Sequence, residues 1–323
     1  MADLFNDIPS LDLQQFTQGT TQERQQFVSA LGTAFNQIGF VAIKNHGLND
    51  ELTEKLYAVV KEFFALPPEV KKQYDRPELH GQRGYTSKGK EHAKGRTTAD
   101  LKEFYQIGQF VDDDDPIKKN YPDNIWPEDE LPAMHPTAKE AYQTLEAAGK
   151  QLLQAIALYL NLEEDYFDRH VHNGNSILRA IHYYPIENPD TVPDDAVRAA
   201  EHGDINLITL LMGASAEGLQ VLRRDGAWIP ITALPDQIIV NVGDMLARLT
   251  NDTLKSTIHR VVNPPRELLG TPRYSIPFFM HPRADMDLTC LESCVSEDQP
   301  KQYNNMTAGE FLEERLREIG LKQ

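Results

Sequence analysis

Long apolar segments are missing from this sequence. No uninterrupted apolar run approaches the ~20 residues that a membrane-spanning helix requires. Residues 1–7 also lack the basic region and the apolar stretch of a signal peptide. We therefore expect a cytoplasmic protein that does not associate with a membrane.

Cysteine and positive charge are scarce as well. Cys290 and Cys294 are the only cysteines, and their C-x₃-C spacing lacks the second pair of ligands that would complete a zinc site. Lysine and arginine number 32 against 49 aspartates and glutamates, which gives a formal charge of −17 at pH 7. This excess of negative charge disfavours binding to nucleic acid or anionic lipid. We expect a small-molecule partner, and the sequence specifies no oligomeric state.

Helical patterns occupy both ends of the chain. Capping boxes at residues 20–23, 137–140 and 307–310 each precede apolar residues at helical spacing. The pattern predicts helices that begin at these positions, the last one running to residue 320. A further amphipathic helix is predicted from Asp50, and an apolar strand is predicted at 40–43.

The segment from 177 to about 280 consists of short β-like runs separated by turn residues. Asp225-Gly226 lies between two of these runs and predicts a hairpin, because both residue types tolerate positive φ. Many short strands without intervening helices indicate an antiparallel sandwich or a jelly roll.

A candidate metal site comes from His202, Asp204 and His259. We interpret His202-Gly203-Asp204 as the start of a strand that continues through residue 208. Side chains two apart on a strand point to the same face, about 6 to 7 Å apart, so this pair could bind one ion. His259, in another β-like run, is the best third ligand. Two imidazoles and a carboxylate leave three positions open, as in non-haem iron(II) oxygenases.

Alone, an H-x-D triplet is weak evidence, since about one is expected by chance in such a chain. Arg273 and Ser275 add to it, because they follow His259 by fourteen and sixteen residues on a predicted strand and share a face. An arginine fork beside a hydroxyl binds a carboxylate well. The alternative is that Arg273 pairs with an acid at the sheet edge. Other histidines are interpreted as ordinary core or surface residues: His46, His80, His92, His135, His170, His172 and His281.

Together these residues resemble a known family. The spacing of His202-x-Asp204, His259 and Arg273-x-Ser275 resembles that of the isopenicillin-N-synthase-like family of iron(II)- and 2-oxoglutarate-dependent dioxygenases. The resemblance extends over nearly the full chain. Further matching segments are 8–13, 39–47, 241–246, 249–251, 256–261 and 273–279.

The resemblance implies a mainly β fold with flanking helices around a double-stranded β-helix, that is, a cupin-like jelly roll. It implies that His202, Asp204 and His259 bind Fe(II), and that Arg273 and Ser275 bind the cosubstrate 2-oxoglutarate.

The stretch from His182 to Pro185 resembles an Asn-Tyr-Tyr-Pro segment that adds contacts to 2-oxoglutarate in many members. Tyr184 corresponds to the contacting tyrosine, whereas His182 replaces the usual asparagine. Both are therefore candidate cosubstrate residues by resemblance.

The implied reaction uses dioxygen and 2-oxoglutarate to oxidise an unactivated C–H bond of a small molecule, by hydroxylation or a related oxidation, and releases succinate and carbon dioxide. Isopenicillin N synthase and the plant ethylene-forming oxidase share the triad and the Arg-x-Ser pair without using 2-oxoglutarate. An iron oxidase of that type is thus one alternative, and a non-catalytic metal-binding jelly roll is another.

The loop between Arg83 and Arg96 is basic for so acidic a chain. We interpret it as a lid in which Arg83, with Tyr85, contacts an anionic or amino-acid-like substrate. The alternative is an exposed flexible loop.

Three regions are predicted: a helical and strand region with this lid at 1–130, a jelly-roll core at 131–290 with the dioxygenase domain at about 175–285, and a helical segment at 291–323.

Overall fold

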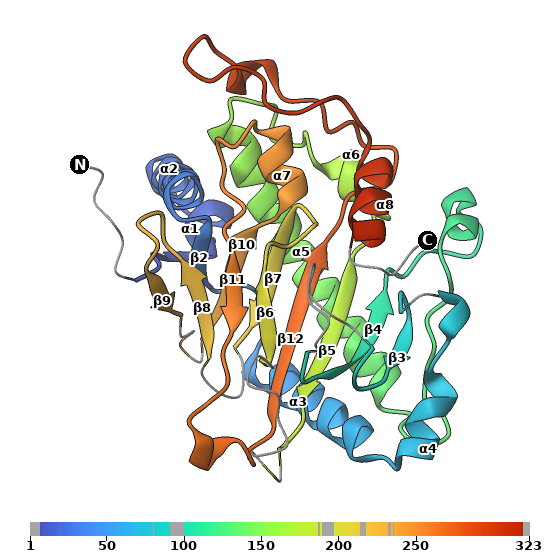
Figure 1. The fold of residues 1–323 in the computed structure, drawn as a ribbon. Helices are drawn as coiled ribbons and strands as arrows, with labels where there is room; N and C mark the ends of the chain where they lie inside the picture. The colour runs from blue at the N-terminus through green and yellow to red at the C-terminus, as the bar shows by residue number, and fades with distance from the viewer. Residues whose placement is uncertain are drawn as a thin grey trace.

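Two sheets form the β core of the protein (Figure 1), and their strands pair antiparallel except for β1, which pairs with β2 in parallel. The computed structural model describes residues 7–79, 81–90, 100–186, 188, 197–213, 218–231, 234 and 236–318. Within these residues a large sheet has the strand order β1-β2-β10-β7-β12-β5-β4-β3, and a small sheet has the order β6-β11-β8-β9. The strands are β1 (Ser10–Asp12), β2 (Phe40–Lys44), β3 (Gly84–Thr86), β4 (Glu103–Gly108), β5 (Ile177–Tyr183), β6 (Ala199–His202), β7 (Ile208–Met212), β8 (Leu219–Leu222), β9 (Trp228–Pro230), β10 (Gln237–Val242), β11 (His259–Val261) and β12 (Arg273–Met280).

α5, the longest of the described helices, covers the large sheet on the side away from the small sheet, and α2 and α3 pack against it, whereas α8 lies at the cavity between the sheets. The apolar face of α5 is buried against β7 and β12, where Leu145, Leu152 and Ile156 are fully buried. Each such side chain stabilises the fold by roughly 2 kcal/mol. The helices are α1 (Leu13–Thr17), α2 (Thr21–Gln37), α3 (Asp50–Ala65), α4 (Pro68–Lys71), α5 (Met134–Tyr159), α6 (Asp168–Val171), α7 (Asp244–Leu249) and α8 (Ala308–Glu318).

Gly149 explains how closely α5 approaches the sheet. A Cβ at this position would lie 2.5 Å from the sulfur of Met280, on β12. A side chain here would have to displace the Met280 side chain, so the glycine lets the helix pack closely on the strand behind the candidate site.

Two of the three predicted capping boxes are confirmed. Thr20 and Glu23 cap α2 reciprocally, and Thr307 and Glu310 form the same contacts before α8. The predicted start of the third helix is wrong, because α5 begins at Met134, before the box at 137–140. A proline at position 136 is tolerated in the first turn, where its missing N–H has no partner within the helix.

The predicted strand through 202–208 is also wrong. β6 ends at His202, β7 begins at Ile208, and residues 203–207 turn from the small sheet to the large sheet. The predicted strand at 40–43 and the hairpin at Asp225-Gly226 are confirmed, the latter joining β8 to β9 with Gly226 at φ 84°. The mainly β architecture with flanking helices is thus confirmed, and it is consistent with a jelly-roll core.

None of the helices in the described ranges has the length and apolar content needed to cross a membrane. Cys290 and Cys294 are buried free thiols.

Candidate active site

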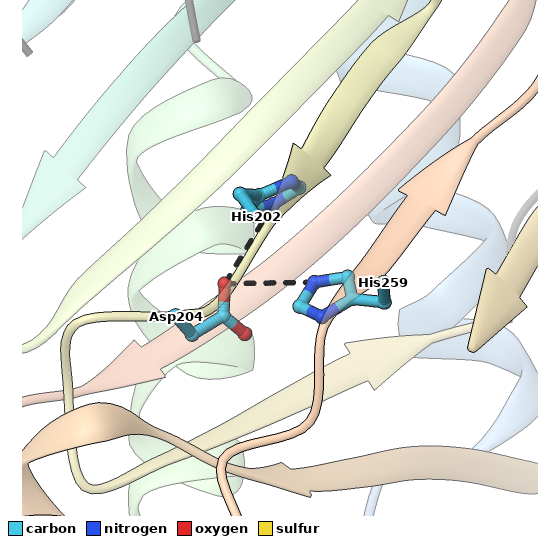
Figure 2. A group of neighbouring side chains, drawn as sticks. All are labelled: His202, Asp204 and His259. Atoms are coloured by element: carbon cyan, nitrogen blue, oxygen red, sulfur yellow. Dashed lines mark ion pairs between the residues drawn. The ribbon is translucent and has the colours of Figure 1, made fainter. Parts of the chain in front are cut away.

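His202, Asp204 and His259 converge between the two sheets (Figure 2). His202 ends β6 directly opposite His259 of β11. Asp204 Oδ1 lies 3.9 Å from His202 Nε2 and 3.7 Å from His259 Nε2. One potential ligand atom from each residue lies within 4.8 Å of the others, so a single ion could contact all three. The grouping arises from an antiparallel pair and a turn, and not from one strand face.

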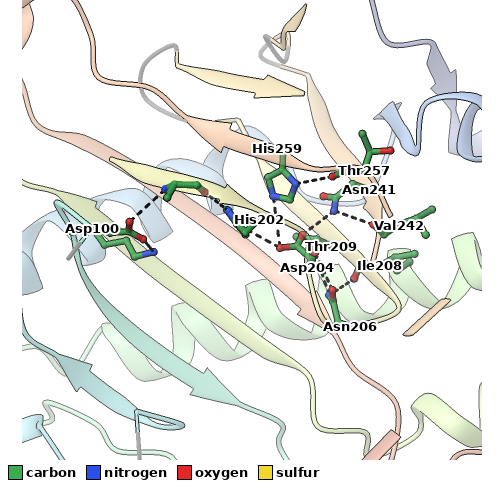
Figure 3. A network of polar contacts seen from close by, with 12 residues as sticks. Asp100, His202, Asp204, Asn206, Ile208, Thr209, Asn241, Val242, Thr257 and His259 are labelled. Carbon is green, nitrogen blue, oxygen red and sulfur yellow. Dashed lines mark hydrogen bonds and ion pairs between the residues drawn. The ribbon is translucent and has the colours of Figure 1, made fainter. Parts of the chain in front are cut away.

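Backbone carbonyls fix both imidazole rings (Figure 3). His202 Nδ1 lies 2.7 Å from the oxygen of Ala200, and His259 Nδ1 lies 3.1 Å from the oxygen of Thr257. A carbonyl can only accept, so each Nδ1 carries the proton and each Nε2 keeps a lone pair for an ion bound between the rings and Asp204. The rings are therefore oriented as metal ligands require.

The carboxylate of Asp204 is held in the same way. Its Oδ2 accepts a 2.6 Å hydrogen bond from Thr209 Oγ1 and a 2.8 Å hydrogen bond from Asn241 Nδ2. These two donors belong to β7 and β10 of the large sheet. The two hydrogen bonds tie the turn at 203–207 to the large sheet, and they leave Oδ1 of Asp204 directed at the histidines (Figure 3).

Electrostatics favours the protonation states that bind metal. Desolvation by the surrounding protein lowers the pKa of His202 to about 4, and the neighbouring His259 is the second cause. This holds although 42 % of the His202 side chain is exposed. Burial opposes ionisation of Asp204, but the two histidines and the hydrogen bonds from Asn241 and Thr209 leave its pKa lowered. At neutral pH His202 is thus uncharged and Asp204 is ionised, the forms that coordinate a cation.

A cavity of about 910 Å³ opens beside the triad and is lined by both sheets and by α8. Arg273 and Ser275 line it, and Arg273 is 1 % exposed. The structure therefore brings the predicted metal triad and this pair, called here the carboxylate clamp, into one cavity. The guanidinium of Arg273 lies 5.0 Å from the ring centre of Tyr183, which lines the cavity too.

Tyr183 stands in the cavity where Tyr184 was expected. In the pairing of β12 with β5, Arg273 is opposite Tyr183 and Tyr274 is opposite His182. Residues opposite one another in an antiparallel sheet share a face, so Tyr183 faces the cavity with Arg273, and His182 faces away with Tyr274. Tyr184 is not part of the lining, and the ammonium of Lys88 lies 4.0 Å from its ring centre.

His182 belongs to a buried network on that other face. Its Nδ1 lies 2.8 Å from Glu103 Oε1, and its ring stacks on Tyr274 at 4.8 Å. Glu103 also receives hydrogen bonds from Lys71 and Tyr85. Burial raises the pKa of Glu103, but these partners prevail and lower it to about 2. His182 and Tyr85 are thus bound to a buried carboxylate instead of lining the cavity.

Arg83 is not brought to the cavity either. Its side chain is 1 % exposed and donates to Gln109 Oε1 at 2.7 Å and to the carbonyl of Gln82. It fits against Gly108, where a Cβ would lie 2.0 Å from the guanidinium carbon. The expected contact between Arg83 and a substrate therefore has no support in this geometry. The loop residues 91–99 lie outside the described residues, as do His80 and His92.

Several polar residues of the cavity were missed by sequence reasoning. Asn175, Arg179 and His281 line it together with Gln106. A period of two along 273–281, set in phase by Arg273, would have found His281, whereas the phase of 175–183 follows only from the pairing of β5 with β12. The default interpretation of His281 as an ordinary core histidine did not anticipate this position.

Comparison with known proteins gives the family. Residues 8–129 match the family model described as the non-haem dioxygenase in morphine synthesis N-terminal region, and residues 174–282 match that of the 2OG-Fe(II) oxygenase superfamily. A 2-oxoglutarate-Fe(II) type oxidoreductase of Metarhizium rileyi is 32% identical over 96% of this chain and 90% of its own length.

Solved structures of similar fold support the same family. A 2OG-Fe(II) oxygenase family protein from Caulobacter crescentus is 43% identical with a TM-score of 0.86, over 97% of this chain and 99% of that chain. A full-length Neurospora crassa protein, solved in complex with alpha-KG and thymine, is 31% identical with a TM-score of 0.84, over 96% of both chains.

This chain belongs to the 2OG-Fe(II) oxygenase superfamily. It is an iron(II)- and 2-oxoglutarate-dependent dioxygenase, an oxidoreductase whose cofactors are Fe(II), 2-oxoglutarate and O₂.

Proposed function

We propose that His202, Asp204 and His259 are the protein ligands of Fe(II) in this enzyme. The donor set fits the ion, because two imidazole nitrogens and one carboxylate oxygen on one side leave open positions for a chelating cosubstrate and O₂. Bound there, iron supplies the dioxygen chemistry that oxidises an unactivated C–H bond while 2-oxoglutarate is converted to succinate and carbon dioxide. The residues of the chain bind and orient the reactants.

The carboxylate clamp is proposed to bind the distal carboxylate of 2-oxoglutarate. Arg273 and Ser275 share a strand face, and the guanidinium is withdrawn from bulk water. A charge-assisted fork of this kind holds a planar carboxylate in one orientation. Tyr183, and not Tyr184, is the tyrosine proposed to assist, because its ring supports the guanidinium.

The apolar part of the cavity is proposed to keep water from the reacting groups. Leu211, Val261 and Ile181 line it from both sheets, and Leu312 and Leu316 line it from α8. Exclusion of water strengthens the contacts of the clamp and protects reactive species from side reactions. A cavity of this size suits a small-molecule substrate.

The narrower expectations remain proposals. An anionic or amino-acid-like substrate is supported by the cationic Arg179 in the cavity, in place of Arg83. A cytoplasmic location is supported by the two free thiols. The three predicted regions, and the particular likeness to isopenicillin N synthase, rest on the sequence patterns alone.

Formation of succinate tests this proposal without knowledge of the substrate. The protein supplied with Fe(II), 2-oxoglutarate, ascorbate and air is expected to release succinate slowly, and removal of iron by a chelator is expected to stop it. The observation that carries the proposal is the presence of the triad and the clamp in one cavity. Iron-loaded protein that binds no 2-oxoglutarate would favour the oxidase alternative.

Tyr183→Leu is expected to weaken 2-oxoglutarate binding about fivefold, because the loss of a cation–π contact with Arg273 costs about 1 kcal/mol. Tyr184→Leu is the matched control, since it removes an adjacent ring that carries its own cation, Lys88, outside the cavity lining. Calorimetric titration of the metal-loaded protein measures both. A larger loss in Tyr184→Leu than in Tyr183→Leu would restore the original assignment.

A further inference from the structure

β6, the strand that ends at His202, lies at the edge of the small sheet. It pairs with β11 alone among the strands that the structure describes, whereas β11, which begins at His259, lies between β6 and β8. The side chain of His202 is 42 % exposed and that of His259 is 10 % exposed. An edge strand presents backbone N–H and C=O groups on its outer side that no neighbouring strand satisfies. The position of His202 therefore depends on what covers the outer side of β6.

Residues 100–102, which lead into β4 of the large sheet, cover this outer side. The backbone N–H of Leu101 donates to the carbonyl of Val197 at 3.2 Å, just before β6 begins. Within β6, the backbone N–H of Ala200 donates to Asp100 Oδ1 at 3.4 Å (Figure 3). The segment that enters the large sheet is thus bound to the edge strand of the small sheet.

Ala200 connects this contact to the proposed metal ligand. The N–H and the C=O of one strand residue point to the same side of the strand. The carbonyl of Ala200 accepts from His202 Nδ1 at 2.7 Å, as Figure 3 shows. The carboxylate of Asp100 therefore holds the residue whose carbonyl orients the His202 ring.

Asp100 is held in turn by a buried ion pair. Lys102 Nζ lies 2.9 Å from Asp100 Oδ2, and the two side chains are 8 % and 7 % exposed. Both residues line the cavity. The desolvation of two charges offsets most of their attraction, so a buried pair adds little net stability, and in some proteins its role is to fix one arrangement of the chain. Here the pair leaves Oδ1 of Asp100 for the N–H of Ala200.

We propose that Asp100 is a positioning residue for His202. It acts on the iron site through the backbone of Ala200, without contact with the ion. The residue belongs to the region matched by the N-terminal family model, so this region contributes to the order of a site whose three ligands all lie in the oxygenase domain. The inference rests on the proposed function, because it takes His202 as an iron ligand.

Two double variants test the proposal, because Asp100→Ala alone would remove the carboxylate that pairs with the buried ammonium of Lys102. Asp100→Asn with Lys102→Met retains a carbonyl oxygen that can accept from Ala200. Asp100→Ala with Lys102→Met retains none. Neither variant keeps a charge of the pair, so the two differ only in the side-chain amide. Co(II) in place of iron is the probe, since its visible absorption bands report the geometry of its ligands.

The variant with alanine is expected to bind Co(II) about tenfold more weakly than the wild type, with altered visible bands. Loss of a group that orients a metal ligand costs about 10- to 100-fold in metal affinity, and a hydrogen bond as long as 3.4 Å places the effect at the lower end. The variant with asparagine is expected to restore the affinity and the bands. A merely structural role would lower the temperature of thermal unfolding without a change in the bands of the bound ion.

Lys71→Met with Glu103→Gln is the matched control. These residues also form a buried pair at 2.9 Å, but neither is part of the cavity lining. Their replacement is expected to leave the affinity and the bands of Co(II) unchanged. The proposal is overturned if the variant with alanine binds Co(II) as the wild type does, or if the variant with asparagine or the control loses as much affinity as the variant with alanine. Wild-type Co(II) binding by His202→Ala would instead contradict the proposed iron ligands, and this inference with them.

Discussion

Asp204→Ala is expected to abolish stoichiometric iron binding and, with it, the formation of succinate. The variant removes the only carboxylate among the three candidate ligands and leaves two imidazoles that face each other across β6 and β11. Two neutral ligands hold Fe(II) weakly. Loss of a residue that only hydrogen-bonds a metal ligand costs up to about 100-fold in metal affinity, so we expect the loss of a ligand itself to cost more. Iron content after desalting, measured by a chromogenic chelator, gives the result directly.

Glu201→Ala is the control for this prediction. Glu201 is an acid one residue from His202, but 54 % of its side chain is exposed and it pairs with Arg260 at 3.2 Å. Its removal is expected to leave iron content unchanged. Asp204→Ala that retains one iron per chain and normal succinate formation would remove this residue from the site, and His202→Ala and His259→Ala can be judged by the same measurement.

The residue types of the site could be predicted from the sequence, but not the way in which the fold assembles them. His202 and Asp204 were expected side by side on one strand, whereas Asp204 lies in the turn that leads to the large sheet. The side chains of Thr209 and Asn241 are what hold it in place. Asn241 is 37 residues further along the chain, and Thr209, although only five residues from Asp204, reaches it because the chain turns between β6 and β7.

The phase of β5 shows a similar limit. Resemblance to a short motif selected Tyr184, whereas pairing with β12 places Tyr183 in the cavity. A shift of one residue exchanges the two faces of a strand, and a tyrosine pair offers no difference in polarity from which to choose. The phase of β5 is fixed by its pairing with β12, which sets Tyr183 opposite Arg273, and the sequence does not specify that register.

Burial of charge was the hardest feature to foresee. Arg83 lies in a polar, glycine-containing segment that is typical of an exposed loop, yet it is almost fully buried. The space that receives it exists because Gly108, on the neighbouring strand β4, has no side chain. Helix boundaries, by contrast, were well predicted where a capping box acts locally, as at Thr20 and Thr307.

Arg273→Ala is expected to raise the concentration of 2-oxoglutarate required for half-maximal succinate formation by on the order of 100-fold, because loss of a buried charge-assisted contact costs about 3 kcal/mol. Arg273 is 1 % exposed, so little solvent can replace its guanidinium. Ser275→Ala removes a neutral hydroxyl and is expected to cost about 1 kcal/mol, or roughly fivefold. The ordering of the two variants is therefore part of the prediction.

Arg198→Ala separates a direct contact from a general loss of positive charge. Arg198 also lies over the ring of Tyr183, at 6.0 Å, but its Nη2 donates to the carbonyl of Thr271 and it is not part of the cavity lining. Its removal is expected to change the 2-oxoglutarate requirement only a few-fold, roughly 0.5 to 1 kcal/mol, as for a charge that makes no contact with the ligand. Because iron is held by other residues, Arg273→Ala should retain its iron while it loses the cosubstrate. Tight binding of 2-oxoglutarate that survives in Arg273→Ala would show that the distal carboxylate is held elsewhere in the cavity, which other cationic side chains also line.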